Sequence, residues 1–178
     1  MPKKSEAPKS KSSWVIVALG SNLGNSRQTV CDAMARLEKL SAAPVLKSSL
    51  WQTAPVHCPP LAPKFVNAVM ALVPSPGETP ESLLEKLQAL EMEFGRTASE
   101  TANAPRPLDL DLIAFGSETR ATPELKLPHP RAHKRRFVLQ PLNEILSDLV
   151  LPLQTQSVWD LLRKLPDPDA VEWLASPI

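Results

Sequence analysis

Two carboxylates interrupt a run of aliphatic residues that otherwise has the composition of a buried strand. Asp109 and Asp111 lie in the segment RPLDLDLIAF, residues Arg106–Phe115. Residues i and i+2 of a strand point to the same face, with Cα atoms about 6.5 Å apart, so both carboxylates project together and require a nearby cation unless they are solvated. Mg²⁺ takes one or two carboxylates and completes its shell with phosphate oxygens and water. The pair therefore predicts either a metal site that works with a nucleotide or an edge strand with a solvated face.

Two arginines flank this segment. Arg106 immediately precedes the strand, and Arg96 follows the helical pattern before it. Guanidinium groups suit phosphate oxygens, and a mobile arginine-bearing loop beside a metal site is typical of phosphoryl transfer. Alternatively, Arg96 only neutralises the C-terminus of that helix, beside Glu93. The spacing alone leaves both interpretations open.

Further polar residues stand at unusual places. Glu91 lies at the edge of a leucine stripe near a helix C-terminus, where the dipole disfavours a carboxylate, and we interpret it as a boundary residue that reaches water. Phe65 and Asn67 share one face of a strand, and an amide suits the edge of a heterocycle. The segment LPHPRAHKRRF, Leu127–Phe137, holds two histidines and four cations. It is either an anion site or a solvated basic loop, and its prolines argue against a helical zinc pair.

Composition limits the class of protein. The chain has 178 residues, of which 43% are hydrophobic and 22% charged, with a formal net charge of +1. We therefore expect one soluble domain, and no global field that recruits nucleic acid or a membrane. Cys31 and Cys58 form neither a disulfide framework nor a CxxC metal motif, so we expect a cytoplasmic location. Residues 1–13 are interpreted as a disordered tail, and no apolar run is long enough to span a bilayer.

The hydrophobic periodicity predicts the order strand, helix, strand, strand, helix, strand. This order is the ferredoxin-like βαββαβ sandwich, an α+β fold in which an antiparallel sheet carries helices on one face. Residues 166–178 are interpreted as an irregular extension of the single domain at residues 14–165, outside the site. The expected strands are Trp14–Gly20, residues 45–53, Phe65–Val73 and the Asp-bearing segment. One expected helix begins at Asn25 or Ser26, and a second runs from the Thr79 cap to Gly95. A C-terminal helical extension is expected at Arg135–Leu146 and SVWDLLRKL.

Taken together, these segments resemble the 6-hydroxymethyl-7,8-dihydropterin pyrophosphokinase family of the folate pathway. The resemblance is carried by VALGSNLGN, FVNAV, GR, PRPLDLDLIAFG and LPHPRAHKRRFVLQPLNEI, in that order. It implies a Mg-dependent transfer of the diphosphoryl group of ATP to the pterin hydroxymethyl oxygen, with release of AMP. It also implies two Mg²⁺ ions, with ATP and 6-hydroxymethyl-7,8-dihydropterin as partners; we expect a monomer.

The resemblance also assigns roles to individual residues. Asp109 and Asp111 would hold the metal ions, and Arg96 and Arg106 would act on the phosphates during catalysis. The remaining residues divide between the two substrates: Gln88, Glu91, Arg106, His129 and Arg135 would bind the nucleotide, whereas Thr53, Val56, Phe65, Asn67 and Phe137 would line the pterin pocket.

The chain departs from the family pattern at Ala98 and Asn103, where a basic residue and a tryptophan are usual, and we therefore expect weaker nucleotide affinity or slower loop closure. It also differs at Ala54 and Phe65, where proline and tyrosine are common; the phenylalanine ring should preserve stacking. Two other functions remain open. One is a non-catalytic ferredoxin-like nucleotide-binding module, and the other is a metal-dependent hydrolase built on the aspartate pair.

Overall fold

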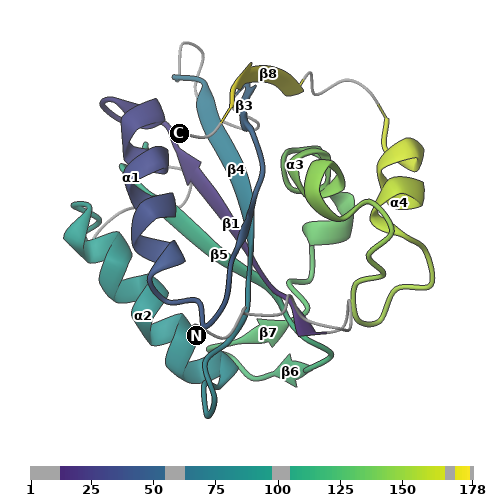
Figure 1. Cartoon of the computed structure of the whole chain (residues 1–178). Helices are drawn as coiled ribbons and strands as arrows, with labels where there is room; N and C mark the ends of the chain where they lie inside the picture. Colours follow the sequence, from purple (N-terminus) through teal and green to yellow (C-terminus); the bar gives the residue numbers. More distant parts are fainter. Residues whose placement is uncertain (1–12, 55–62, 98–104, 167–170, 177–178) are drawn as a thin grey trace, which may run out of the picture.

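A single antiparallel sheet forms the centre of the molecule, with helices on both of its faces (Figure 1). The structure is a computed structural model that describes residues 13–54, 63–97, 105–166 and 171–176. The strand order is β5-β1-β4-β3-β8, and the short β2 pairs with β4. The strands of this sheet are β1 (Val15–Ser21), β2 (Leu46–Lys47), β3 (Leu50–Thr53), β4 (Phe65–Leu72), β5 (Asp109–Phe115) and β8 (Val171–Ala175).

The predicted ferredoxin-like plan is confirmed. Helices α1 (Ser26–Glu38) and α2 (Pro80–Glu93) cover one face of the sheet. Asn25 caps α1 by accepting a hydrogen bond from Gln28 N–H. Thr79 caps α2, and Pro80 occupies its first turn, where the missing N–H costs nothing. Local sequence signals therefore set where both helices begin.

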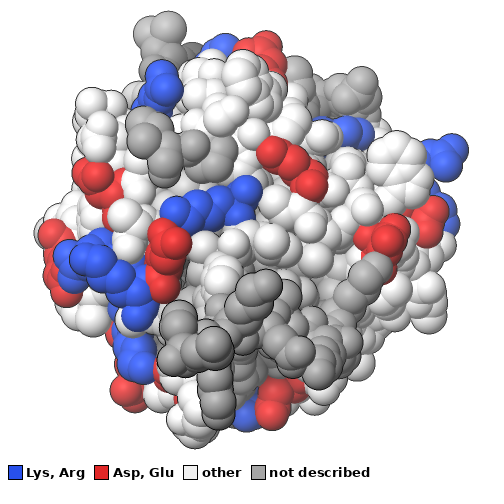
Figure 2. Space-filling view, in the orientation of Figure 1, with Lys and Arg blue, Asp and Glu red and all other residues white. Residues whose placement is uncertain are grey.

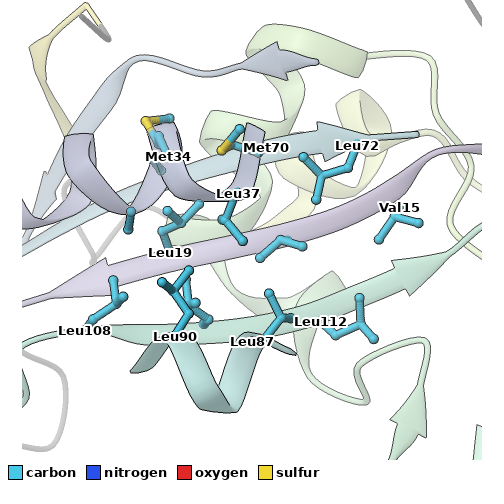
Figure 3. Packing of buried hydrophobic residues seen from close by; sticks show 14 of the residues in the cluster. Val15, Leu19, Met34, Leu37, Met70, Leu72, Leu87, Leu90, Leu108 and Leu112 are labelled. Carbon is cyan, nitrogen blue, oxygen red and sulfur yellow. The ribbon is translucent and has the colours of Figure 1, made fainter. Parts of the chain in front are cut away.

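The core between these helices and the sheet is built from alternate residues of each strand (Figure 3). Leucine and methionine side chains of α1 and α2 pack onto valines and leucines of β1, β4 and β5. Leu37 and Leu87 are fully buried, one on each helix. The leucine stripe of α2 is buried at Leu83, Leu87 and Leu90, whereas Leu84 and Phe94 are only partly buried.

The opposite face of the sheet carries the C-terminal helices α3 (Arg136–Leu146) and α4 (Val158–Lys164). Ile16, Ala18, Val69, Ala71 and Ile113 supply the sheet side of this second core. Both helices were predicted. The second apolar layer, between these helices and the sheet, follows only from the strands, whose side chains alternate between the two faces and leave an apolar surface on each of them.

Three elements differ from the sequence-based prediction. The expected strand at residues 45–53 is split into β2 and β3, because Ser48 Oγ accepts the hydrogen bond of Val69 N–H at 2.9 Å and interrupts the regular ladder. A small hairpin, β6 (Arg120–Ala121) and β7 (Lys126–Leu127), was not predicted. The end of the chain, expected to be irregular, forms the edge strand β8 beside β3.

The surface is mixed in charge. Figure 2 shows acidic and basic side chains interspersed over the visible face, in line with the formal net charge of +1. Any anion site must therefore be a local cluster. Within the described residues no helix is both long and apolar enough to cross a bilayer.

Candidate active site

Three strands place polar residues in one row on the face that carries α3. Asp109 of β5 pairs with Gly20 of β1, and Gly20 pairs in turn with Asn67 of β4. Directly opposed residues of an antiparallel sheet project to the same face, and neighbouring strands lie about 4.8 Å apart. The Asp109 and Asn67 backbones are therefore about 10 Å apart, on either side of a glycine that adds no side chain.

Asp109 receives two arginines. Arg96 Nη1 donates to Asp109 Oδ1 at 3.1 Å, and Arg106 Nη1 donates to the same oxygen at 3.0 Å. The residues next to these arginines also lie close together: Gly95, which follows α2 with a φ of +95°, would place a Cβ 3.8 Å from Pro107 Cγ. The structure thus confirms the expectation of a cation beside the aspartate pair, and it brings both predicted arginines together.

Glu91 corrects one sequence interpretation. Its side chain does not reach water but is buried, with the residue 6% exposed. Leu110 N–H donates to Glu91 Oε1 at 2.7 Å, and Arg96 Nη1 lies 2.5 Å from the same oxygen. The physical reason is that β5 is the edge strand of the sheet formed by the described residues, so its outward N–H needs a partner from outside that sheet. Burial raises the pKa of Glu91, and the Leu110 N–H and Arg96 offset this only in part.

Asp111 has a different set of neighbours. Arg135 Nη1 lies 3.6 Å from Asp111 Oδ2, and the Arg135 guanidinium stands 5.4 Å from the centre of the Phe137 ring. Burial, and then the negative charge of Asp109, raise the pKa of Asp111; His129, Arg135 and Arg106 oppose the rise. Burial also lowers the pKa of Arg135. Because the Arg135 guanidinium lies near both Asp111 and the Phe137 ring, Phe137 joins the same face as the aspartates.

His129 is held beside the strand that bears the aspartates. The backbone N–H of His129 donates to the carbonyl oxygen of Ile113 at 2.8 Å, and its ring Nδ1 accepts from the backbone N–H of Arg131 at 3.2 Å. Burial lowers the pKa of His129, and the negative charge of Asp111 acts in the opposite direction. The basic segment is therefore not a solvated loop as a whole, because His129 and Arg135 face Asp111.

The other end of the row forms a smaller polar group. Asn67 Nδ2 donates to Thr53 Oγ1 at 2.9 Å, and both residues are buried. A Cβ on Gly20 would lie 3.5 Å from Asn67 Oδ1 and 4.0 Å from Phe65 Cδ1. The predicted ring-binding residues Phe65 and Asn67 thus lie against Gly20, and Thr53 joins them through its hydrogen bond with Asn67.

The remaining predicted site residues are not part of these contacts. Gln88 lies one turn before Glu91 on α2 with an exposed side chain. Val56, Ala98 and Asn103 lie outside the described residues, and so does the expected mobile part of the loop between Arg96 and Arg106. Sequence reasoning missed Gly20, although a glycine inside a strand signals the close approach of another group.

The donor set fits a hard cation that phosphate completes. Asp109 and Asp111 offer carboxylate oxygens from one face of β5. The two carboxylates repel each other, since the negative charge of Asp109 is one cause of the raised pKa of Asp111, and a cation between them would relieve this repulsion. Among the described residues no cluster of three or more histidines, cysteines or carboxylates could hold a metal ion alone. Two carboxylates with further oxygens from phosphate and water is a typical Mg²⁺ arrangement.

Comparison with known proteins gives a consistent result. The family model described as 7,8-dihydro-6-hydroxymethylpterin-pyrophosphokinase (HPPK) matches residues 16–147. The chain is 40% identical over 139 residues to the 2-amino-4-hydroxy-6-hydroxymethyldihydropteridine pyrophosphokinase of Pseudomonas aeruginosa, covering 78% of this chain and 83% of that protein. It is 42% identical over 130 residues to the Bacillus subtilis protein of the same name, covering 72% and 75%.

Longer proteins match as well. The folic acid synthesis protein fol1 of Pneumocystis carinii is 37% identical over 156 residues; the match covers 87% of this chain but only 20% of that protein. A solved structure of the Plasmodium falciparum HPPK-DHPS triple mutant with pteroate superimposes with a TM-score of 0.66 at 12% identity, over 85% of this chain and 43% of that one. The structural likeness confirms the ferredoxin-like fold.

Proposed function

The chain belongs to the 7,8-dihydro-6-hydroxymethylpterin-pyrophosphokinase family, and on this premise we propose that it is a pyrophosphokinase of folate biosynthesis. The reaction transfers the diphosphoryl group of ATP to the hydroxymethyl oxygen of 6-hydroxymethyl-7,8-dihydropterin and releases AMP. The family and the relatives support this activity over a non-catalytic nucleotide-binding module. The observation that carries it is the row Asp109–Gly20–Asn67, which sets a phosphate-type end and a ring-binding end about two strand spacings apart.

We propose that Asp109 and Asp111 hold two Mg²⁺ ions, which would neutralise negative charge on the triphosphate. Arg96 and Arg106 converge on Asp109, so their guanidinium groups are ready to transfer to phosphate oxygens when nucleotide binds there. Glu91 contacts the same Arg96 Nη1 that bonds to Asp109. His129 and Arg135 serve the same end from the Asp111 side, and Gln88 is proposed as a further nucleotide contact.

The pterin hydroxymethyl oxygen would attack the β-phosphorus, the bond to the oxygen of the α-phosphate would break, AMP would leave, and the hydroxyl proton would pass to solvent. Asn67 and Thr53 would bind polar atoms of the pterin, and Phe65 and Phe137 would stack on its ring; Val56 is the fifth proposed residue of this pocket. The protein contributes position and electrostatics rather than a covalent intermediate.

A product assay tests the function. Purified protein is mixed with MgATP, with and without the dihydropterin, and the nucleotides are separated. We expect AMP only when pterin is present, and no AMP from the Asp109→Asn, Asp111→Asn double variant. Asp32→Asn is the matched control, because it makes the same chemical change at an exposed carboxylate of α1 that accepts a hydrogen bond from Gln28 on its own helix.

The outcomes separate the alternatives. No AMP from a folded wild-type protein that binds ATP would favour the non-catalytic module. ADP or phosphate released without pterin would favour the hydrolase. Removal of metal with a chelator and its titration back should abolish and restore AMP formation; activity without metal would refute the metal role. The monomeric state, the cytoplasmic location and the absence of nucleic-acid binding stay predictions.

A further inference from the structure

Asn22 lies in the turn that follows β1, and its side chain makes a contact that none of the roles above uses. The residue is 2% exposed. Arg106 N–H donates to Asn22 Oδ1 at 2.9 Å, and Asn22 N–H donates to the carbonyl oxygen of Arg106 at 3.3 Å. Both backbone polar groups of Arg106 are therefore held by one residue from a distant part of the chain.

The local sequence explains why a side chain is needed. The ladder between β1 and β5 ends where Gly20 pairs with Asp109. If the same register continued, Asn22 would face Pro107, which has no N–H to donate. The regular ladder cannot continue there. The side-chain carbonyl of Asn22 provides the acceptor that holds the chain one residue earlier, at Arg106.

This contact fixes the start of the short segment that delivers an arginine to the site. Leu108 is fully buried and anchors the segment in the core. Asn22 anchors its other end at the backbone of Arg106, whose side chain places Nη1 3.0 Å from Asp109 Oδ1. Its side chain is 18% exposed. The Asn22 contacts thus set the backbone position beside β1 from which the Arg106 guanidinium reaches Asp109.

We propose that Asn22 is a positioning residue whose side-chain carbonyl holds Arg106 in register, so that the Arg106 guanidinium meets the phosphate oxygens of a nucleotide bound at Asp109. The inference rests on the proposed function for the identity of that ligand. It assigns to Asn22 an effect on the nucleotide and on the rate, and none on the pterin.

Three variants test the chemistry. Asn22→Leu keeps the approximate volume but removes the acceptor, and Asn22→Asp keeps an acceptor oxygen at the same position. Asn25→Leu is the matched control, because Asn25 lies in the same turn and also accepts a backbone N–H, that of Gln28 at 3.4 Å, but only to cap α1. Asn22→Ala replaces Asn22→Leu if the leucine variant does not fold.

Two readouts are measured on each variant: kcat for AMP formation, and the affinity for the non-hydrolysable α,β-methylene-ATP with Mg²⁺ by calorimetry. We expect Asn22→Leu to lower both about tenfold, the usual effect of leaving an N–H without its partner, with the KM for pterin changed less than about twofold. Asn22→Asp should recover most of the loss. Asn25→Leu should lower the melting temperature and leave both readouts unchanged.

A double-mutant cycle separates positioning from a general structural role. If Asn22 acts through Arg106, Asn22→Leu should cost little more once Arg106→Ala is present, because the two changes remove the same interaction. Equal losses in both backgrounds would overturn the proposal, as would a wild-type value for Asn22→Leu. Because affinity for the analogue needs no turnover, a protein that makes no AMP but shows the coupling would refute the proposed function alone. A protein that binds no analogue would overturn both.

Discussion

Replacement of Glu91 by leucine should destabilise the fold, although it puts an apolar side chain at a buried position. Glu91 is 6% exposed and accepts the N–H of Leu110, on the edge strand β5, at 2.7 Å. Leucine leaves this N–H without an acceptor, which costs about 1–3 kcal/mol. Arg96 keeps Asp109 at 3.1 Å, so its loss of Glu91 adds less. For a chain of this length we expect the melting temperature to fall by about 2–12 °C.

Glu91→Gln provides the matched control because it keeps a carbonyl acceptor for Leu110. Burial raises the pKa of Glu91 in the folded state, so the folded protein keeps this proton to a higher pH than the unfolded chain does. The contribution of Glu91 to stability therefore falls as the pH rises from the ordinary glutamate value through the raised folded value. Glutamine cannot ionise. We thus expect the glutamine variant to gain stability relative to wild type over that range and to differ least below it.

Thermal unfolding followed by circular dichroism, from acidic to neutral pH, measures both effects. The hydrogen-bond argument would be refuted if Glu91→Leu melted at the wild-type temperature. If Glu91→Gln lost as much stability as Glu91→Leu, the charge rather than the acceptor would be the stabilising feature. A wild-type stability that rises through the stated pH range relative to Glu91→Gln would contradict the sign of the pKa shift.

Three further predictions concern the proposed pterin end and the core. Thr53→Val removes the oxygen that receives Asn67 Nδ2 at 2.9 Å, and should raise the KM for pterin about tenfold without changing that for ATP, as steady-state kinetics would show. Gly20→Ala should be tolerated, because its Cβ would make ordinary contacts of 3.5 Å and 4.0 Å, whereas the larger Gly20→Leu should abolish pterin binding in calorimetry while the protein stays folded. Leu87→Ala opens a cavity in the core beneath α2 and should cost about 2–5 kcal/mol in denaturant unfolding, with unchanged kcat in the folded fraction.

Several features of the site could be predicted from local sequence because a local rule governs each of them. Alternation along a strand puts Asp109 and Asp111 on one face of their strand, and the same rule puts Phe65 and Asn67 on one face of theirs. The caps Asn25 and Thr79 and the stop at Gly95 also depend only on neighbouring residues. Like charges in a strand require a nearby cation, so a positive partner could be expected before any partner was known.

Contacts between distant segments decided the rest. The sequence by itself determined the succession of the central strands and helices along the chain, the apolar stripes and the strand face that both aspartates share. These features follow from backbone periodicity and capping, which act over a few residues. Only the tertiary structure decided that Glu91 is buried as a partner of an edge strand, that β8 closes the far edge, and that Asn22 holds Arg106 across 84 positions of the chain. Such pairings depend on sheet order and register, which arise from the packing of the whole chain and leave no periodic signal in the sequence around each residue.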